Sequence, residues 1–169
     1  MGTTGPIVSA KLTLVRTLPK FTLSDHKRTA HSIDDLMGPR GMLLGFIGDI
    51  WSPISIERIL YMQVKAKKFA QIGFPAAIIV QGRVSTLANF MLNSPLVISV
   101  PLLADPDGKV QGQYEASKGT ALMLIDRSHV LRYTWQVSDE KVWPPTAEVL
   151  TVANNMRRIG RSVRLNAGK

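Results

Sequence analysis

The chain contains no cysteine among its 169 residues. This absence excludes structural disulfides, cysteine-type zinc sites, iron–sulfur clusters and every reaction that needs a thiolate nucleophile. Long apolar runs are missing as well: the runs 42–47, 74–80 and 95–104 are far shorter than the roughly 20 residues of a membrane-spanning helix. The first residues also lack the basic segment and apolar core of a signal peptide. We therefore expect a cytoplasmic protein, free or peripheral to a larger complex.

Clusters of metal-ligating side chains are missing too. The three histidines, His26, His31 and His129, show no ligand spacing, and Asp105 and Asp107 stand in a loop without the remaining oxygen ligands of a calcium site. The sequence predicts no metal site and no cofactor.

What is present suits one folded domain. Hydrophobic residues make up 45% of the chain and charged residues 20%, which is enough for a full core. The net charge of +9 is unevenly distributed, because five basic residues and no acidic one lie in the last thirteen positions: Arg157, Arg158, Arg161, Arg164 and Lys169. Such a tail attracts an anionic partner, which can be an acidic protein, nucleic acid or lipid headgroups; the alternative is a solubilising end that binds nothing.

The order of apolar patterns predicts an α/β fold. We expect a first strand over 8–16, an extended segment over 19–25, a short helix over 32–36, and a helix from the 52–55 turn to Gly73. Further strands are expected at 42–47, 76–81, 101–104, 121–125 and 130–136, and further helices at 86–92, 110–116 and 146–159. Parallel strands joined by helices and followed by a hairpin predict a central mixed β-sheet flanked by helices.

One turn carries a chemical signature. An apolar strand runs into Trp51, then Ser52-Pro53-Ile54-Ser55, then a helix. This layout resembles the active-site turn of thioredoxin-fold redox proteins, in which Trp-Cys-x-x-Cys lies at the same junction. Serines here occupy both cysteine positions.

Four further segments make the resemblance narrower. They are Pro19-x-Phe21-x-Leu23-x-Asp25, Ser32–Leu36 followed by Arg40-Gly41, Leu102–Gly108, and Leu124–Arg127 followed by Val130–Tyr133. In this order they resemble the peroxiredoxin family (alkyl hydroperoxide reductase / thiol-specific antioxidant proteins) over 19–159. The resemblance implies a thioredoxin-like domain over 19–159, an N-terminal extension or strand over 1–18, and a basic C-terminal tail over 160–169.

The departures from the family fall on its catalytic positions. When the family pattern Pro-x-x-x-Thr-x-x-Cys is placed with Ser55 at the cysteine, Ser52 falls at the threonine and Gly48 at the proline. The family's arginine before the hairpin corresponds to Thr120. Ser52, Ser55 and Thr120 are therefore expected to be vestigial positions with no catalytic role.

Two interpretations of the serines remain open. Either Ser52 caps the following helix, or one serine acts as a nucleophile with Asp49 or Glu57 as its base. For the whole chain, we expect a redox-inactive homologue that serves as a binding or structural subunit with a protein partner or a second copy. The alternatives are a thiol peroxidase of the same family whose cysteine has been replaced, and a nucleic-acid accessory protein.

Overall fold

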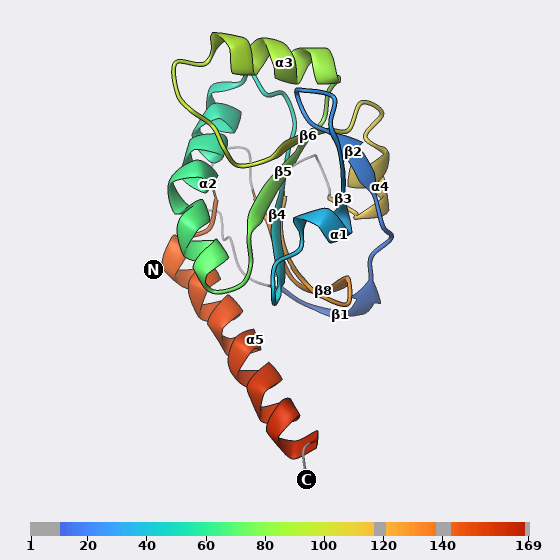
Figure 1. Cartoon of the computed structure of the whole chain (residues 1–169), viewed down its shortest axis with the longest axis vertical. Helices are drawn as coiled ribbons and strands as arrows, with labels where there is room; N and C mark the ends of the chain where they lie inside the picture. Colours follow the sequence, from blue (N-terminus) through green and yellow to red (C-terminus); the bar gives the residue numbers. More distant parts are fainter. Residues whose placement is uncertain (1–10, 117–120, 138–142, 168–169) are drawn as a thin grey trace, which may run out of the picture.

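The computed structural model describes residues 11–116, 121–137 and 143–167 of the chain. Its centre is a six-stranded sheet (Figure 1). In spatial order the strands are β1 (Lys11–Thr17), β8 (Val130–Gln136), β7 (Ala121–Asp126), β4 (Gly41–Ile47), β5 (Ala76–Val80) and β6 (Leu102–Ala104).

The sheet is mixed, as the sequence predicts. Strand β4 pairs in parallel with β5 and antiparallel with β7, so that Gly45 lies between Ile78 and Leu122. Strand β6 continues the parallel half, and β8 and β1 continue the antiparallel half. The chain reaches each parallel strand through a helix, because a parallel connection must return to the starting edge of the sheet.

A second, two-stranded sheet pairs β2 (Thr22–Ser24) with β3 (Ala30–Ser32). The sequence indicated an extended segment with a turn after it, and it did not indicate the second strand. Three-residue strands leave too short an alternation to detect.

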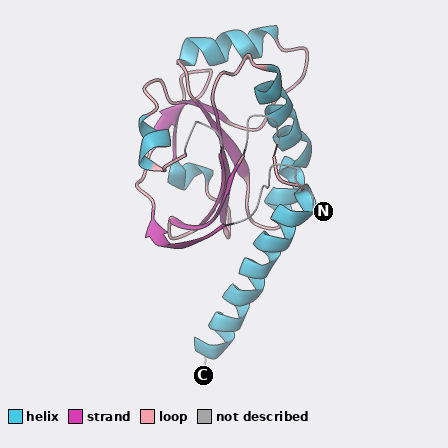
Figure 2. Ribbon diagram, turned by 180° about the vertical axis from the view of Figure 1, so that it is seen from behind, coloured by secondary structure: helices cyan, strands magenta, loops and turns pink. Residues whose placement is uncertain are grey.

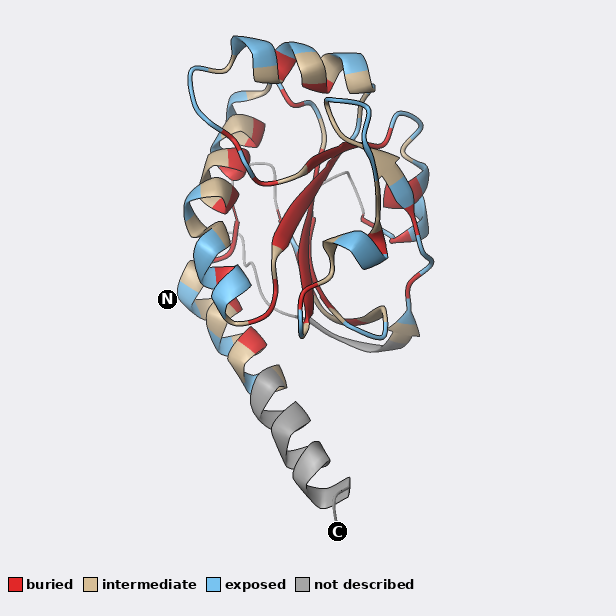
Figure 3. Cartoon of the chain, viewed as in Figure 1, coloured by how far each residue is buried: buried red, intermediate tan, exposed pale blue. Residues whose placement is uncertain are grey.

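The central strands β4 and β5 are buried along their whole length (Figure 3). Successive side chains of β4 belong to opposite cores. Leu43 and Ile47 pack towards α2 (Pro53–Gln71), α3 (Val84–Asn93) and α5 (Thr146–Ala167). Met42, Leu44 and Phe46 pack towards α1 (Ile33–Leu36) and α4 (Lys109–Gln113). A strand buried on both faces explains the unbroken apolar run over 42–47.

The layers are visible in opposite views: α2 and α5 lie on one side of the sheet and α1 and α4 on the other (Figures 1 and 2). The helix boundaries agree with the sequence analysis at most ends. Helix α4 ends at Gln113, three residues before the expected end, and the largest difference is in the last helix, which continues to Ala167 instead of ending at Ile159. Gly160 follows directly, but a single glycine is tolerated within a helix, and no proline comes after it to end the helix.

Candidate functional site

The turn with the serines connects β4 to α2 and is held by its own backbone. The carboxylate Oδ1 of Asp49 accepts a hydrogen bond of 2.9 Å from the N–H of Trp51. The carbonyl of Asp49 accepts another, of 3.2 Å, from the N–H of Ser52. These two bonds bring the chain from the end of the central strand directly into the first turn of the helix.

Ser52 is the N-cap of α2. Its backbone is extended, its Oγ accepts a hydrogen bond of 3.2 Å from the N–H of Ser55, and Pro53 occupies the first turn, where a missing N–H has no cost. The hydroxyl of Ser52 also donates to Oγ of Ser55 at 2.9 Å. Ser55 is buried, with 2% of its surface exposed. The two serines are thus close together, and both hydroxyls have hydrogen-bond partners.

Nothing in the described part of the chain activates either serine. Asp49 is bound to the backbone of Trp51, and the described hydrogen bonds join neither serine hydroxyl to an acid or a histidine. A nucleophilic serine needs such a base. The positive end of α2 would favour a thiolate at this position, but a serine hydroxyl does not ionise near neutral pH.

Two of the histidines pair with aspartates instead, one in the β2–β3 region and one in α1. Nε2 of His31 lies 2.8 Å from Oδ2 of Asp25, and Nε2 of His129 lies 2.7 Å from Oδ1 of Asp34. The pKa of Asp34 is lowered by the hydrogen bond from His129 and then by the one from Lys20. Burial opposes the ionisation of Asp25, but hydrogen bonds from His31 and two backbone N–H groups lower its pKa overall.

The described residues also offer no cluster of metal-ligating side chains. Within the described ranges, no group of three or more histidine or acidic side chains is placed to hold a metal ion. The buried carboxylate of Asp105 accepts hydrogen bonds from the N–H groups of Val110 and Gln111, so its loop serves as the start of α4. In the part of the chain that the structure describes, no helix combines the length and the apolar character needed to cross a membrane.

The structure describes only some of the other positions that the sequence predicts to belong to the site. Gly48 lies at the end of β4, where an added Cβ would meet nothing within 4 Å. Thr120 and Lys169 lie outside the described residues. Positions 157, 158, 161 and 164 lie on α5, and their side chains are also outside the described part.

Behind the turn, Arg58 is a buried residue that the sequence did not indicate. It is 3% exposed, and its guanidinium carbon lies 5.7 Å from the ring centre of Trp143. The indole N–H of Trp143 donates to the carbonyl of Arg58 at 3.0 Å. An arginine on a helix with several lysines is typical of a solvated face, so no sequence signal marked it as buried.

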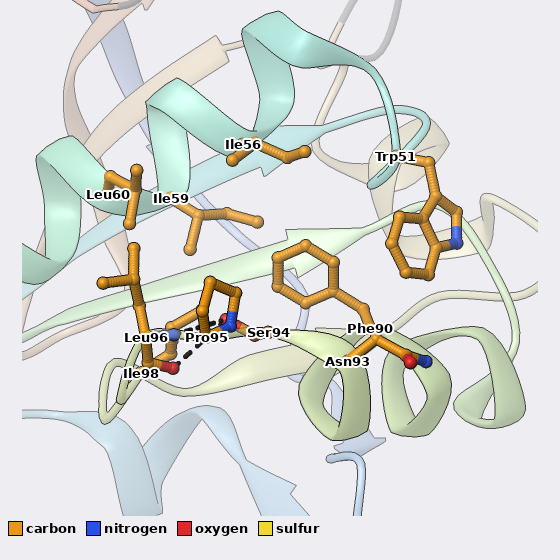
Figure 4. Close-up of a pocket in the computed structure, with 10 residues that line it drawn as sticks. All are labelled: Trp51, Ile56, Ile59, Leu60, Phe90, Asn93, Ser94, Pro95, Leu96 and Ile98. Carbon is orange, nitrogen blue, oxygen red and sulfur yellow. Dashed lines mark hydrogen bonds between the residues drawn. The ribbon is translucent and has the colours of Figure 1, made fainter.

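Beside the turn, an apolar groove lies between α2, α3 and the loop that follows α3 (Figure 4). Its volume is about 170 Å³. The exposed ring of Trp51 forms one end and contacts Phe90 edge-on, with 5.4 Å between the ring centres. The lining residues of this α2–α3 groove are Trp51, Ile56, Ile59, Leu60, Phe90, Asn93, Ser94, Pro95, Leu96 and Ile98.

Large apolar side chains are exposed in and around the groove. Trp51 and Leu96 are about half exposed, and Leu92 and Val97 are 83% and 87% exposed. The other two tryptophans, Trp135 and Trp143, are buried in the core. The sequence did not indicate the groove, because its walls come from segments thirty or more residues apart, Trp51–Leu60 and Phe90–Ile98.

Comparison with known proteins gives the family. The model of the AhpC/TSA family matches residues 15–141, which is more than half of the chain. The chain belongs to the AhpC/TSA family. A search of curated proteins gives no match.

Solved structures show the same fold at low sequence identity. The peroxidoxin BcpB from Mycobacterium tuberculosis has a TM-score of 0.68 and 21% identity, covering 88% of this chain and 99% of that one. A putative thiol:disulfide interchange protein DsbE from Chlorobium tepidum has a TM-score of 0.68 and 17% identity, covering 85% and 99%. A yeast mitochondrial 1-Cys peroxiredoxin has a TM-score of 0.76 and 12% identity, covering 89% and 79%. The predicted thioredoxin-like fold is confirmed.

The site of this AhpC/TSA protein therefore combines a family fold with a chain that has no thiol. At the strand-to-helix turn, Ser52 and Ser55 form a cap and a buried hydrogen bond. Next to them lies an exposed apolar groove.

Proposed function

We propose that this AhpC/TSA protein is redox-inactive and acts by binding, as a subunit of a larger assembly. The observation that carries the proposal is the pair Ser52 and Ser55, whose hydroxyls bond to each other and to the start of α2. Reduction of a peroxide by this family's chemistry needs a thiolate that attacks the peroxide oxygen. A chain without cysteine cannot supply that sulfur.

The binding role is supported by the surface beside the turn. Soluble proteins rarely expose neighbouring large apolar side chains without a partner. Trp51 and Leu96 are exposed at the α2–α3 groove, and Val97, next to Leu96 in the chain, is exposed as well. An aromatic anchor beside a pocket is typical of a protein-binding surface. The partner is a different protein or a second copy of the chain.

The basic tail supports a further contact with an anionic partner. The last thirteen residues carry five basic side chains and no acidic one. Charge of one sign attracts an opposite surface and is screened by salt.

An assay of peroxide turnover tests the proposal that the protein is redox-inactive. The purified full chain is mixed with hydrogen peroxide and dithiothreitol or a thioredoxin system, and peroxide loss is followed against heat-denatured protein. We expect no loss above that control. Sustained consumption beyond seven equivalents per chain, which is more than its seven methionines can take up by oxidation to sulfoxide, would establish the alternative, an enzyme that turns over peroxide with a group other than a thiol.

A cysteine variant extends the test. Ser55→Cys places a thiol at the family position, but the family's arginine position is Thr120 in this chain, which offers no positive charge. A thiol without a cationic hydrogen-bond donor has a higher pKa and a less stabilised transition state. We expect Ser55→Cys to remain far slower than an active peroxiredoxin assayed in parallel, and comparable rates would show that another cation fills the role.

Sedimentation velocity tests whether the α2–α3 groove binds a second copy of the chain. If the groove pairs two copies, the full chain shows a concentration-dependent increase in mass that Trp51→Ala and Leu96→Ser reduce. If the chain stays monomeric at all concentrations, the partner is a different protein. A dimer that is unaffected by both variants would exclude the groove as its interface.

A further inference from the structure

The exposed large apolar side chains of the described residues come from the segments that form the α2–α3 groove. They are Trp51, Val64, Leu92, Leu96 and Val97. Two of them line the groove, and each of the other three lies within four residues of a lining residue. The apolar area that the described part of the chain leaves in water is therefore concentrated in one region of the surface.

Charge is absent from the lining of the groove and from the segment that forms one of its walls. None of the ten lining residues is charged. The segment from Val84 to Ala104 contains no acidic residue, no basic residue and no histidine, although 20% of the chain is charged. A charged group that docked here would lose its water without gaining an ion-pair partner from the lining, which costs free energy. The docking part of a partner is therefore uncharged.

The polar side chains of the lining are hydrogen-bonded within their own segment. Nδ2 of Asn93 donates to the carbonyl of Asn89 at 2.8 Å. Oγ of Ser94 accepts a hydrogen bond of 3.2 Å from the N–H of Leu96 and donates to the carbonyl of the same residue at 3.1 Å. Because these groups are already engaged, an apolar occupant suits the groove better than a polar one.

The volume of the groove limits the size of its occupant. The groove measures about 170 Å³, which is close to the cavity of about 150 Å³ that holds one benzene molecule in another protein. Trp51 lies at one end of the groove, and Leu60 and Leu96 lie at the other (Figure 4). A space of this size takes one large side chain, and the rings of Trp51 and Phe90 favour an aromatic one.

We propose that the α2–α3 groove receives one aromatic side chain from an uncharged, apolar segment of a different protein. The inference rests on the proposed function and deepens it, because it gives the binding partner its chemistry. A free aromatic molecule would fill the groove but leave the neighbouring Leu92 and Val97 in water, so a protein segment is favoured. A second copy of this chain is disfavoured, because two chains of net charge +9 repel each other.

Short capped peptides mixed with the full chain test the proposal. Their central residue is phenylalanine, alanine or lysine, and glycine and serine surround it. We expect the phenylalanine peptide to bind between about tenfold and a hundredfold more tightly than the alanine peptide, because the buried ring supplies most of the binding free energy. The lysine peptide should not bind, because its charge would be desolvated.

NMR of the three indole N–H signals gives the affinity and an internal control. Trp51 is exposed at the groove, and its signal should move as the phenylalanine peptide is added. Trp135 and Trp143 are buried in the core, and their indole N–H groups are hydrogen-bonded within the protein, so their signals should stay in place.

Two neighbouring substitutions separate the groove from its surroundings. Leu96→Glu places a carboxylate in the lining and should weaken binding of the phenylalanine peptide by about tenfold or more. Val97→Glu adds the same charge to a side chain outside the lining and should change the affinity by less than about threefold. Both original side chains are exposed, and circular dichroism checks that both variants keep the fold.

A second peptide distinguishes a protein partner from a free aromatic ligand. It carries a valine on each side of the phenylalanine, so that it can also cover apolar side chains next to the groove. We expect it to bind on the order of tenfold more tightly than the peptide with glycine and serine, and Val97→Glu should remove part of this gain. Equal affinity of the two peptides would overturn the docking of a protein segment, because it would show a site for an isolated ring.

Three further results would contradict the proposal. The first is an unmoved Trp51 signal with the phenylalanine peptide at up to about 10 mM, since weaker binding has no use for a docking site. The second is equal binding of the lysine peptide, and the third is an equal loss of binding in Leu96→Glu and Val97→Glu.

A second copy of the chain provides the competing outcome. If the apparent affinity for the phenylalanine peptide falls as the concentration of the chain rises, and sedimentation shows a dimer, the groove belongs to a second copy and the assignment to a different protein is wrong. None of these results affects the proposal that the protein is redox-inactive, which depends on peroxide turnover.

Discussion

Ser52 and Ser55 differ from the cysteines of related redox turns by one atom each, and that atom decides the chemistry. Sulfur at the positive end of a helix ionises readily, whereas a hydroxyl does not. The hydroxyl instead accepts a hydrogen bond from a backbone N–H of the first helical turn, which would otherwise lack a partner. At this scale, the hydroxyl of Ser52 caps α2 and bonds to Ser55.

Replacing Ser52 by alanine measures that structural role. Ser52→Ala removes the cap of α2, and we expect the free energy of unfolding to fall by roughly 0.5–2 kcal/mol. Urea denaturation followed by tryptophan fluorescence gives the value. Ser52→Asp should retain most of the stability, and Ser128→Ala, on an exposed side chain, serves as the control. An unchanged midpoint in Ser52→Ala together with loss of an activity would reopen the case for a working hydroxyl.

Asp34 predicts a dependence of stability on pH. His129 and Lys20 hold the pKa of this carboxyl below its ordinary value in the folded chain. Its contribution to stability is therefore present above the unfolded pKa and is lost as the pH falls below about 4. Asp34→Asn should destabilise the protein at pH 6 and approach the original chain at about pH 3.

Urea denaturation at both pH values checks this. The control is Asp107→Asn, which changes an exposed carboxylate that takes part in none of the described salt bridges. A difference between Asp34→Asn and the original chain that is the same at both pH values would contradict the ionic explanation.

Among the elements, α2 has the most varied role, because it connects the turn, the core and the groove. Ser55 and Ile59 are buried, and Ile59 lines the groove together with Ile56 and Leu60. Gln63, two turns further along, holds the loop that forms the opposite wall. Its Oε1 accepts hydrogen bonds from the N–H groups of Ser99 and Val100 at 2.7 and 2.9 Å, and its Nε2 donates to Oγ of Ser99 at 2.9 Å.

Removal of this side chain should loosen the wall of the groove. In Gln63→Ala, the amide protons of Ser99 and Val100 lose their acceptor, and we expect them to exchange with solvent between about fivefold and a hundredfold faster. Hydrogen exchange measured by NMR gives the rates. Gln63→Glu keeps the accepting oxygen and should restore protection, and Gln71→Ala, exposed at the end of α2, is the control. Unchanged exchange would show that packing alone holds the loop.

At the scale of the whole molecule, the family match stops short of the last helix. The match to the AhpC/TSA family ends at residue 141, before α5 begins at Thr146. Among the α5 side chains that the structure describes, which end at Met156, Val149 and Ala153 are buried. The fold should therefore depend on the start of α5 and tolerate the loss of its end.

Two truncations test this division. A chain ending at Met156 keeps the buried residues of α5, and we expect its free energy of unfolding to fall by no more than about 1 kcal/mol. A chain ending at Pro145 lacks Val149 and Ala153 and should lose several kcal/mol or fail to fold. Urea denaturation measures both. A loss of several kcal/mol in the chain that ends at Met156 would mean that the end of α5 is needed for the fold.

Much of the fold could be predicted from the sequence, because its signals are local. The apolar run over 42–47, the serine and proline at the start of α2 and the glycine after it each depend on a few neighbouring residues. The absence of any thiol follows from the sequence alone, because the chain contains no cysteine. These features determined the α/β class, the resemblance to peroxiredoxins and the absence of thiol chemistry.

Only the tertiary structure decided which distant residues meet. It pairs β2 with β3, buries Arg58 against Trp143, and forms the groove from Trp51, Phe90 and Leu96. Contacts of this kind depend on how helices pack over the sheet, which the spacing of residues along one helix does not reveal. The sequence therefore determined that this protein lacks a thiol, and the packing of its helices over the sheet decided which apolar side chains stay exposed.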